Sequence, residues 1–460
     1  MLYSSTRGSE NSVEFEKVVL SGLASDGGLF VPDEISQISK SKLNNMRDLS
    51  YSELVHQITW IFVKSNISKE DYTKICEITY NEFSDNEIIS IKKLNNKEYI
   101  LNLFHGPTLA FKDYALQLLG NIYNFILKKK KIKLTIVGAT SGDTGSAAIH
   151  GCSKSNLIKM FILFPYNKVS PIQRMQMTTF NKSNVFNLAI KGDFDDCQNL
   201  VKSLFEINEK EKKFNLAAVN SINWVRIMGQ IVYYFWAYFN CCDDNEMINF
   251  SVPTGNFGNA YAAFIAMKMG LPINKIIIAS NKNDVLTRFF ETGQMKKLKT
   301  FETLSPSMDI QVSSNFERLL YHYIDKVEVN QLFLRLKSKG DFQLSKSIIS
   351  KMKKRFQVGR LDDNKTTDCI KKMFLKYKIV VDPHTAVGIS IGKRFLNKEN
   401  IKNVYLATAH YGKFLNTINK SLEKKMKLPD KLNNLKSYEE KFDILDNDVE
   451  KLKNYIQSNN

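Results

Sequence analysis

INFSVPTGNFGNAYAAF, residues 248–264, runs from an apolar segment through a turn with two glycines into a helical pattern. The same order recurs in three other stretches: KLTIVGATSGDTGSAAIHG (133–151), LIKMFILFPYNKVSPIQRMQMTTF (157–180) and KIIIASNKNDVLTRFF (275–290). Short apolar runs that end in Gly, Ser, Thr or Asn and lead into helices are typical of βα units around a parallel sheet. The predicted fold class is therefore α/β.

The rest of the chain predicts how these units are grouped into domains. Residues 1–98 contain amphipathic helical patterns and predict a helix-rich N-terminal domain. We expect a large α/β domain at 99–130 and 245–420, and a smaller α/β domain at 131–244. Residues 421–460 are rich in Lys, Asn and Leu with heptad-like spacing, so they predict a helical tail packed on the body.

Three local predictions test this interpretation. The charged stretch 303–378 is expected to be helical apart from a polar turn, and KIVVD (378–382) is expected to form a strand before a helix. The most apolar run, residues 231–239, is expected to be a core helix, because it is far shorter than the roughly 20 residues that span a membrane.

Composition limits the classes of function. The 65 Lys and Arg exceed the 47 Asp and Glu and give a net charge of +18, but they are scattered and often stand beside Asn. A nucleic-acid-binding surface gathers its basic residues on one face, so we expect no nucleic-acid partner and no membrane partner. The six cysteines lack C-x-x-C spacing and predict reduced thiols in a cytoplasmic protein. The histidines lack the spacing of metal ligands, and no metal site is expected.

The stretch LFHGPTLAFKDYA (103–115) places a lysine directly after an apolar run. An amine that reacts with a carbonyl group must be held away from bulk water so that it can lose its proton. Lys112 is therefore the candidate for covalent and acid–base chemistry.

Three turns after strands supply candidates for ligand binding. Gly255 and Gly258 allow backbone N–H groups to approach an anion at a helix N-terminus, although the same glycines also suit a tight βα turn. Ser141 and Thr144 could hold a substrate carboxylate or could simply cap a helix. Thr408 ends an apolar strand, where its hydroxyl could contact a ligand ring or serve as a cap. Together, a lysine, a phosphate-binding turn and a hydroxyl at a strand end are what pyridoxal 5′-phosphate requires.

Nine motifs then give a resemblance to a known family. In chain order they are HGPTLAFKD, GATSGDTGSAA, SPIQRMQMTT, VNSINWVRI, PTGNFGN, TLSPSMDI, SSNFERLL, DPHTAVG and TAHYGKF. They resemble the signature stretches of the threonine synthase family, in particular its fungal and bacterial branch with a long N-terminal domain. The resemblance implies a pyridoxal-phosphate enzyme of fold type II, which is the tryptophan-synthase-β-like fold, with the cofactor in the large α/β domain.

The resemblance also implies roles for individual residues. Lys112 matches the lysine that forms a Schiff base with the cofactor, and Thr408 matches the threonine that bonds to its pyridine nitrogen. The loop that binds the cofactor phosphate corresponds to Gly255, Asn256, Phe257, Gly258 and Asn259. The loop expected to face the cofactor and the substrate carboxylate contains Ser141, Asp143 and Thr144. For the substrate phosphate we predict Asn223 and Arg226, although an arginine on a helix can equally be half of a surface ion pair.

The chain departs from the family pattern at two places. Asn259 stands where the family often has Asp, which removes a negative charge near a bound phosphate. Tyr411 and Gly412 replace the Pro-Ala of TAHPAKF, which loosens the turn after Thr408.

The activity implied is that of a carbon–oxygen lyase acting on phosphates, which converts O-phospho-L-homoserine and water into L-threonine and phosphate. Two enzymes of the same fold remain as alternatives: a phospho-lyase that acts on the same substrate, and a serine/threonine dehydratase. A further alternative is a basic protein that binds anions or nucleic acid on this fold without catalysis. Either a monomer or a homodimer fits the resemblance.

Overall fold

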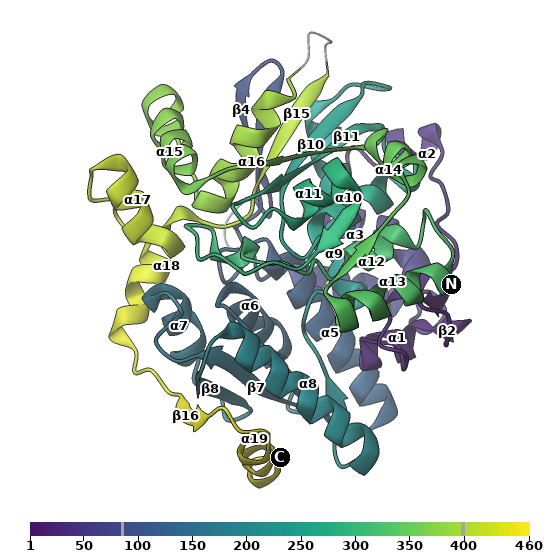
Figure 1. The fold of residues 1–460 in the computed structure, drawn as a ribbon, viewed down its shortest axis with the longest axis vertical. Helices are drawn as coiled ribbons and strands as arrows, with labels where there is room; N and C mark the ends of the chain where they lie inside the picture. Colours follow the sequence, from purple (N-terminus) through teal and green to yellow (C-terminus); the bar gives the residue numbers. More distant parts are fainter. Residues whose placement is uncertain (84–86, 397–400) are drawn as a thin grey trace.

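The computed structural model describes residues 1–83, 87–396 and 401–460. Most of its strands belong to two sheets, the larger one lying above the smaller one in Figure 1. The six-stranded sheet has the order β14-β11-β10-β15-β5-β4, and the five-stranded sheet has the order β16-β8-β7-β6-β9. All neighbours are parallel except the edge pair β4 and β5. The predicted α/β fold is therefore confirmed.

The strands have the following bounds. The larger sheet contains β4 (Ser90–Asn95), β5 (Glu98–Asn102), β10 (Ile248–Pro253), β11 (Ile273–Ser280), β14 (Phe356–Arg360) and β15 (Lys402–Ala407). The smaller sheet contains β6 (Leu134–Ala139), β7 (Ile158–Pro165), β8 (Val185–Lys191), β9 (Leu216–Ala217) and β16 (Asp443–Asp446). Outside them lie the N-terminal sheet of β1 (Leu2–Ser5), β2 (Val13–Glu14) and β3 (Phe30–Pro32), and the pair β12 (Gln294–Lys296) and β13 (Asp341–Gln343).

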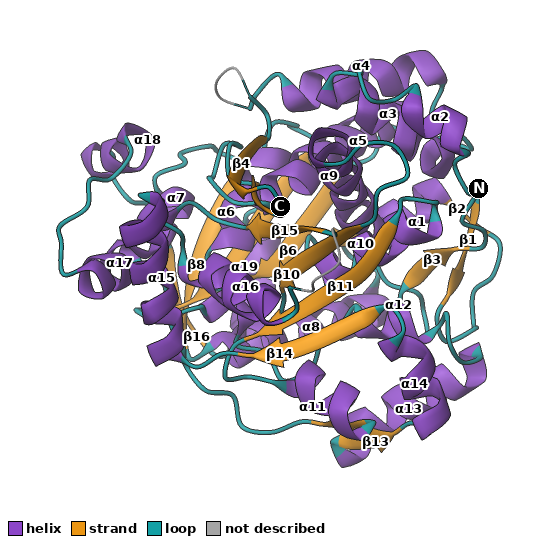
Figure 2. Ribbon diagram, turned by 90° about the horizontal axis from the view of Figure 1, so that it is seen from above, coloured by secondary structure: helices purple, strands orange, loops and turns teal. Residues whose placement is uncertain are grey.

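Helices cover both sheets (Figure 2). In the N-terminal region they are α1 (Phe15–Ser21), α2 (Lys40–Asn44), α3 (Tyr51–Val63) and α4 (Lys69–Tyr80). In the middle of the chain they are α5 (Lys112–Lys130), α6 (Asp143–Cys152), α7 (Pro171–Thr178), α8 (Phe194–Glu211), α9 (Trp224–Cys241), α10 (Gly258–Lys268) and α11 (Val285–Thr292). Later come η1 (Pro306–Met308), α12 (Phe316–Leu320), α13 (Lys326–Lys339), α14 (Lys346–Lys353), α15 (Asp363–Tyr377), α16 (Pro383–Arg394), η2 (Tyr411–Phe414), α17 (Leu415–Leu422), α18 (Asp430–Asn433), η3 (Asn434–Ser437) and α19 (Val449–Ser458).

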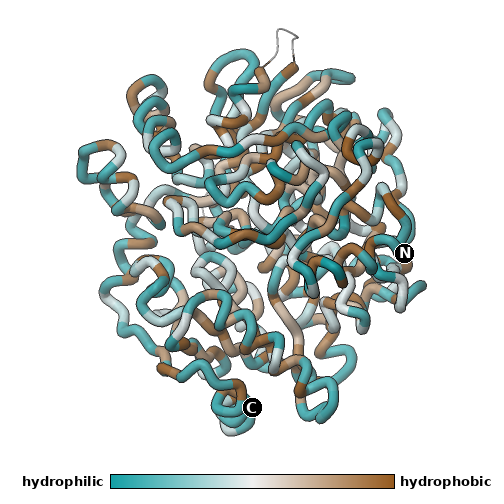
Figure 3. Tube along the Cα trace, in the orientation of Figure 1, coloured by the Kyte–Doolittle hydropathy of each residue, from teal (hydrophilic) through white to brown (hydrophobic). Residues whose placement is uncertain are grey.

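The core lies between the sheets and the central helices. Strand β10 is buried along its whole length, as expected of a parallel strand covered on both faces. Helix α9 contains the predicted core helix 231–239, and most of its residues are buried. Figure 3 shows apolar residues gathered on the central strands and helices, while the outer helices are more polar.

Helices α5 and α6 pack unusually closely, with glycine at the contact. A Cβ built on Gly120 would lie 2.0 Å from the carbonyl oxygen of Gly151, and one built on Gly151 would lie 2.3 Å from that of Leu116. The two backbones therefore touch without side chains between them. Because α5 begins at Lys112 and α6 begins at Asp143, this contact holds two of the predicted site residues near each other.

Three details differ from the sequence predictions. The stretch 303–378 contains a strand, β14, at the edge of the larger sheet, and its mixed composition FQVGR conceals it. Residues 378–382 form no strand, because Asp382 instead caps the N-terminus of α16 by accepting from the N–H of His384. The N-terminal region contains a small sheet in addition to its helices.

The C-terminal tail is not only helical. It descends along one side of the molecule from α17 to α19 (Figure 1), and on the way β16 joins the edge of the smaller sheet beside β8. The tail therefore runs from the region of the larger sheet to the edge of the smaller sheet and connects the two. The domain boundaries given above stay predictions.

Two features are absent from the described residues. No helix there is long and apolar enough to cross a membrane. No group of three or more His, Cys, Asp or Glu side chains in that part of the chain could hold a metal ion.

Candidate active site

A cavity of about 930 Å³ is lined by residues that follow strands of both sheets. Thr408 and Ala409 directly follow β15, and the other lining residues include Ala139, Thr140, Ser141, Asp143 and Thr144 where β6 meets α6, and Pro253, Thr254, Gly255, Asn256, Gly258 and Asn259 where β10 meets α10. Phe257, which was predicted for the cofactor phosphate, is not among the lining residues. Ligands of open α/β sheets bind at the carboxyl ends of the strands. The cavity occupies this place, and it contains most of the predicted site residues.

Lys112 lies in the cavity wall as the first residue of α5. The segment before it is attached to the end of β15: Ala110 forms a bridge with Ala409, and the N–H of Phe111 donates to the carbonyl of Thr408 (2.9 Å). The side chain of Lys112 is 12% exposed, and its Nζ lies 4.9 Å from the centre of the Phe111 ring. Phe111, the last residue of the apolar run, thus lies beside the amine and helps to shield it.

Charged residues on other elements lie near Lys112 and shift its pKa. Its Nζ lies 3.4 Å from Oδ2 of Asp143, whose Oδ1 lies 2.7 Å from Nζ of Lys413. Burial lowers the pKa of Lys112, the Asp143 charge raises it, and the charges of Lys413 and Arg226 lower it further, so that it lies below the ordinary lysine value. The amine is thereby brought closer to its neutral, nucleophilic form.

Burial alone would raise the pKa of Asp143, but its partners reverse this. The charges of Lys413 and Lys112, with hydrogen bonds from Lys413 and from Nε2 of Gln173 (2.8 Å), hold the pKa well below the ordinary value. Asp143 is therefore an ionised carboxylate at neutral pH.

The glycine turn after β10 is held from outside the cavity. The hydroxyl of Ser313 donates to the carbonyl of Gly255 (2.6 Å), and both the backbone N–H and the Nδ2 of Asn315 donate to the carbonyl of Asn256 (3.0 and 3.1 Å). The turn leads into the N-terminus of α10 at Gly258. Because two of its carbonyls are committed elsewhere, the turn offers N–H groups and the positive end of a helix dipole, which suit a phosphate.

Phe257 and Asn259 of this loop have side chains that contact other parts of the protein. The ring of Phe257 is buried and packs against Phe316, while its backbone adopts a left-handed conformation (φ 61°) before α10. Asn259 lines the cavity, but its Oδ1 accepts from the hydroxyls of Tyr233 and Tyr234 (2.5 and 2.6 Å) and its buried Nδ2 has no partner among the described residues. This free donor is a group that a ligand could satisfy.

The DPHTAVG motif holds the backbone of Thr408 through a chain of hydrogen bonds. Its N–H donates to Oγ1 of Thr385 (3.3 Å), and the hydroxyl of Thr385 donates to Asp382. Asp382 also contacts Nδ1 of His384 (2.8 Å), while Nε2 of His384 accepts from the N–H of Ser307 (3.2 Å). An accepting Nε2 places the imidazole proton on Nδ1 in the neutral ring. His384 lines the cavity and had not been predicted as a site residue.

The residues predicted for substrate binding are placed differently from one another. Ser141, Thr144 and Arg226 line the cavity. Arg226 is 2% exposed, donates through Nη1 to the carbonyl of Val219 (2.6 Å), and has no partner for Nε among the described residues. Burial lowers its pKa to about 10, so it stays a cation at neutral pH. It is not the exposed half of a surface ion pair.

Asn223 does not line the cavity. Its Oδ1 caps α9 by accepting from the N–H of Val225 (3.1 Å), and its Nδ2 donates to the carbonyl of Val19 (2.9 Å). Its neighbours Asn220 and Ser221 do line the cavity. Within the VNSIN motif, Asn220 and Ser221 therefore line the cavity, whereas the predicted Asn223 does not.

The residues missed from the sequence are of two kinds: some, such as His384, line the cavity, and others lie behind it. Lys413, Gln173 and Asn315 support other groups. They stand in the motifs TAHYGKF, SPIQRMQMTT and SSNFERLL, so the signal was present but did not show what each side chain contacts.

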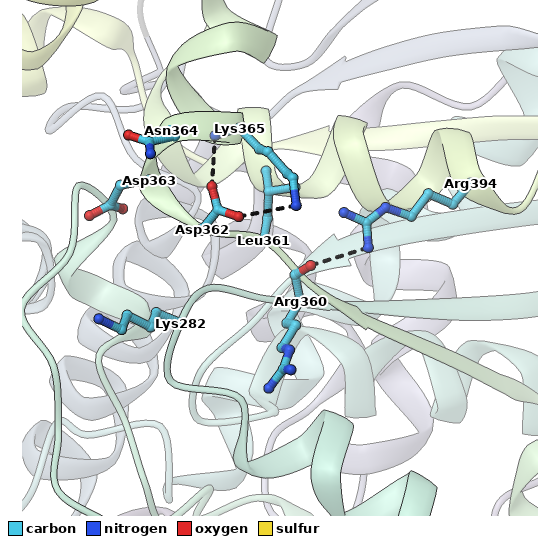
Figure 4. A pocket seen from close by; sticks show the side chains of 8 residues that line it. All are labelled: Lys282, Arg360, Leu361, Asp362, Asp363, Asn364, Lys365 and Arg394. Carbon is cyan, nitrogen blue, oxygen red and sulfur yellow. Dashed lines mark hydrogen bonds and ion pairs between the residues drawn. The ribbon is translucent and has the colours of Figure 1, made fainter.

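A second, smaller pocket of about 670 Å³ lies beyond the ends of β11 and β14 (Figure 4). Most of its charged groups have partners: Lys365 pairs with Asp362 (3.2 Å) and Arg394 donates to the carbonyl of Arg360 (3.2 Å). The Arg360 guanidinium pairs with Asp284, which lies outside the pocket lining. None of the predicted site residues lies there, so we place the chemistry in the larger cavity.

Comparisons with known proteins agree along the whole chain. A family model described as threonine synthase N terminus matches residues 2–80, one described as pyridoxal-phosphate dependent enzyme matches residues 85–331, and one described as threonine synthase, C-terminal matches residues 385–456. The threonine synthase of Pseudomonas aeruginosa is 41% identical over 459 residues, which cover 99% of the chain and 98% of that relative.

Two solved structures are similar over nearly the same length. Threonine synthase from Brucella melitensis with pyridoxal phosphate bound has a TM-score of 0.95 at 40% identity and covers 99% of both chains. Threonine synthase from yeast has a TM-score of 0.94 at 39% identity, with 100% of this chain and 98% of that chain covered.

Proposed function

The chain belongs to the threonine synthase family of pyridoxal-phosphate-dependent enzymes, and we propose that its cavity converts O-phospho-L-homoserine and water into L-threonine and phosphate. One observation carries the proposal for the site. Lys112, the glycines Gly255 and Gly258 with Asn256, and Thr408 line the same cavity at the carboxyl ends of neighbouring strands.

The residues present fit pyridoxal phosphate. The turn at Gly255 and Gly258 would hold its phosphate, Thr408 would accept or donate a hydrogen bond at its ring nitrogen, and Lys112 would bond to its aldehyde carbon. The buried, unpaired Nδ2 of Asn259 is a further donor in the same wall. When bound, the cofactor withdraws electrons from the substrate and so makes its Cα and Cβ protons acidic.

Lys112 then acts as the base. With substrate in the cavity, Nζ of Lys112 would remove the proton from Cα and carry protons to and from the neighbouring carbons. The lowered pKa of Lys112 favours this role, because a lysine with an ordinary pKa stays protonated at neutral pH. The adjacent ring of Phe111 limits access of water to the amine.

Arg226 is the proposed partner of the substrate phosphate. It is a buried cation in the cavity wall with a free Nε, and a phosphate would satisfy both its charge and this donor. The hydroxyls of Ser141 and Thr144 would bind the substrate carboxylate, together with N–H groups at the start of α6. Asp143 is an anion that is already paired, so it would not contact that carboxylate itself.

We place this reaction in the cytoplasm. All six cysteines are buried free thiols, which a reducing compartment maintains. A small molecule rather than a nucleic acid is the proposed partner, and size-exclusion chromatography distinguishes the monomer from the homodimer.

Product analysis with O-phospho-L-homoserine tests the proposal. We expect L-threonine and phosphate in equal amounts from the purified protein loaded with pyridoxal phosphate. Release of 2-oxobutyrate and ammonia instead would identify a phospho-lyase, and turnover of serine or threonine alone would identify a dehydratase. Absence of any bound cofactor after reconstitution would favour a non-catalytic anion-binding protein.

A further inference from the structure

Asp143 lies between two lysines that differ in their access to the cavity. Lys112 lines the cavity, whereas Lys413 is fully buried behind it. The two lysines approach different oxygens of the same carboxylate, Lys413 at 2.7 Å and Lys112 at 3.4 Å. Lys413 is therefore the closer partner of Asp143.

Lys413 is held firmly in this position. Besides Asp143, its Nζ donates to the carbonyl of Thr108 (2.8 Å), which also accepts from Nε2 of Gln176 (2.9 Å). Lys413 belongs to η2, which follows β15, while Thr108 belongs to the loop that leads to Lys112. Lys413 thus joins three segments of the site without reaching the cavity.

The position of Lys413 bears on the buried charge of Asp143. A buried carboxylate without a cation is costly, because the charge is removed from water without compensation. If Lys112 were the only partner of Asp143, then each loss of the Lys112 proton would leave that carboxylate unpaired. With Lys413 present, Asp143 keeps a cation when Lys112 becomes neutral.

We propose that Lys413 is a positioning residue that holds the charge of Asp143 and so frees Lys112 to lose its proton during the reaction. The inference rests on the proposed function only in taking Lys112 as the reactive amine. Lys413 acts through Asp143 and does not contact the substrate.

The other titratable groups around Lys112 do not replace Lys413 as the partner of Asp143. Arg226 on α9 is a cation and adds to the repulsion of a charged Lys112. Asp113 on α5 accepts from the N–H and the hydroxyl of Thr108 (2.8 and 2.7 Å). His384 and Asp309 line other parts of the cavity, where His384 contacts Asp382 and Asp309 accepts from Thr303.

The experiment measures how the reactivity of Lys112 depends on pH. The full-length chain, freed of cofactor and checked for its fold by circular dichroism, is labelled with a trace of acetic anhydride across a pH series. Peptide mass spectrometry then reports the modification of Lys112. Only a neutral amine reacts, so the midpoint of this profile is the pKa of Lys112.

We expect Lys413→Met to raise the midpoint by about one pH unit or more. The substitution removes a cation that repels the charged Lys112, and it leaves Lys112 as the remaining lysine beside Asp143. Lys413→Arg keeps the charge and should keep the wild-type midpoint. In an Asp143→Asn background, Lys413→Met should shift the midpoint less than it does in the wild-type background, because only the direct repulsion is then removed. If Lys413→Met does not fold, Lys413→Gln takes its place, since it retains hydrogen-bond donors without charge.

An unchanged midpoint in Lys413→Met, or an equal shift in the two backgrounds, would overturn the inference. Failure of the proposed function would look different. In that case Lys112 would not be the residue joined to pyridoxal phosphate after borohydride reduction, whatever the labelling profile showed.

Discussion

The backbone N–H of Phe111 donates to the carbonyl oxygen of Thr408 at 2.9 Å. This bond connects the residue before Lys112 to the threonine at the end of β15. The amine and the hydroxyl that would meet opposite ends of the cofactor ring therefore lie on segments that a backbone hydrogen bond joins. Changes to either side chain should therefore affect chemistry more than folding.

The first prediction concerns Lys112→Ala. The variant should fold and should still take up pyridoxal phosphate in the glycine turn, but borohydride should no longer fix the cofactor to the protein. Turnover should fall at least about a hundredfold, because a general acid–base is lost. Mass spectrometry of the reduced protein measures the attachment, and Lys129→Ala on the exposed end of α5 is the control. Attachment at another lysine would show that Lys112 is not the reactive amine.

The second prediction concerns Thr408→Val, which keeps the shape of the side chain and removes its hydroxyl. Loss of one neutral hydrogen bond costs about 0.5–1.5 kcal/mol, so turnover should fall by about threefold to tenfold. The absorption band of the bound cofactor should shift as well. Thr408→Ser keeps the hydroxyl and should behave nearly as wild type. Equal activity of the two variants would mean that the hydroxyl is only structural.

The sequence predicted the groups at the surface of the cavity better than the groups behind them. Gly255 and Thr408 stand in turns directly after apolar strands, Lys112 begins the helix after β5, and such segments gather at one edge of a parallel sheet. The contact of Lys413 with Asp143 depends on how α6 meets the loop after β15. No local pattern contains that information, because it arises from the packing of segments far apart in the chain.

The same distinction applies to the fold. Strands β6, β10 and β11 are buried on both faces, so their continuous apolar runs were easy to recognise. Strands β14 and β16 lie at sheet edges and carry polar residues, so their pattern resembles that of a loop or helix. Sheet edges are specified by pairing with a distant neighbour more than by composition.

The third prediction separates Arg226 from Asn223. Arg226→Gln should raise KM for O-phospho-L-homoserine by about tenfold to a hundredfold, because a hydrogen bond to a charged group contributes about 1.5–3 kcal/mol. Asn223→Ala should instead lower the melting temperature, because it removes the cap of α9, while KM changes little. Steady-state kinetics and thermal unfolding measure the two effects. The opposite pattern would assign the phosphate to Asn223.

The fourth prediction concerns the pH dependence of stability. The folded-state pKa of Asp143 lies below its unfolded value of about 3.9, so its contribution is fully present above that pH and is lost as the pH falls through the folded pKa. Asp143→Asn should therefore lower the melting temperature by a constant amount between about pH 6 and 8. The gap between variant and wild type should narrow as the pH falls below about 4.

Thermal unfolding across a pH series measures this gap. Asp446→Asn is the matched control, because Asp446 pairs with Lys191 and Lys451 at the surface, where solvent screens the charges. It should change the melting temperature little at any pH. A gap for Asp143→Asn that widens in acid would contradict the ion-pair arrangement.

The last prediction tests the close contact between α5 and α6. In Gly120→Ala the new methyl group would meet the carbonyl oxygen of Gly151 at 2.0 Å, and backbone cannot move aside as a flexible side chain can. Overpacking costs about 1–3 kcal/mol or more, which in a chain of 460 residues should lower the melting temperature by about 1–3 °C or more. Because the two helices begin at Lys112 and Asp143, the strain should also separate these side chains and weaken turnover.

A control is needed because alanine also changes backbone freedom. Gly340→Ala places a methyl group where nothing lies within 4 Å, but in a backbone with φ of +78°, so it costs conformational strain without a clash. It lies directly after α13 and does not itself line the cavity, so the substitution should leave turnover intact. A Gly120→Ala variant that is as stable and as active as wild type would show that the helices can move apart, and that their contact does not position the catalytic lysine.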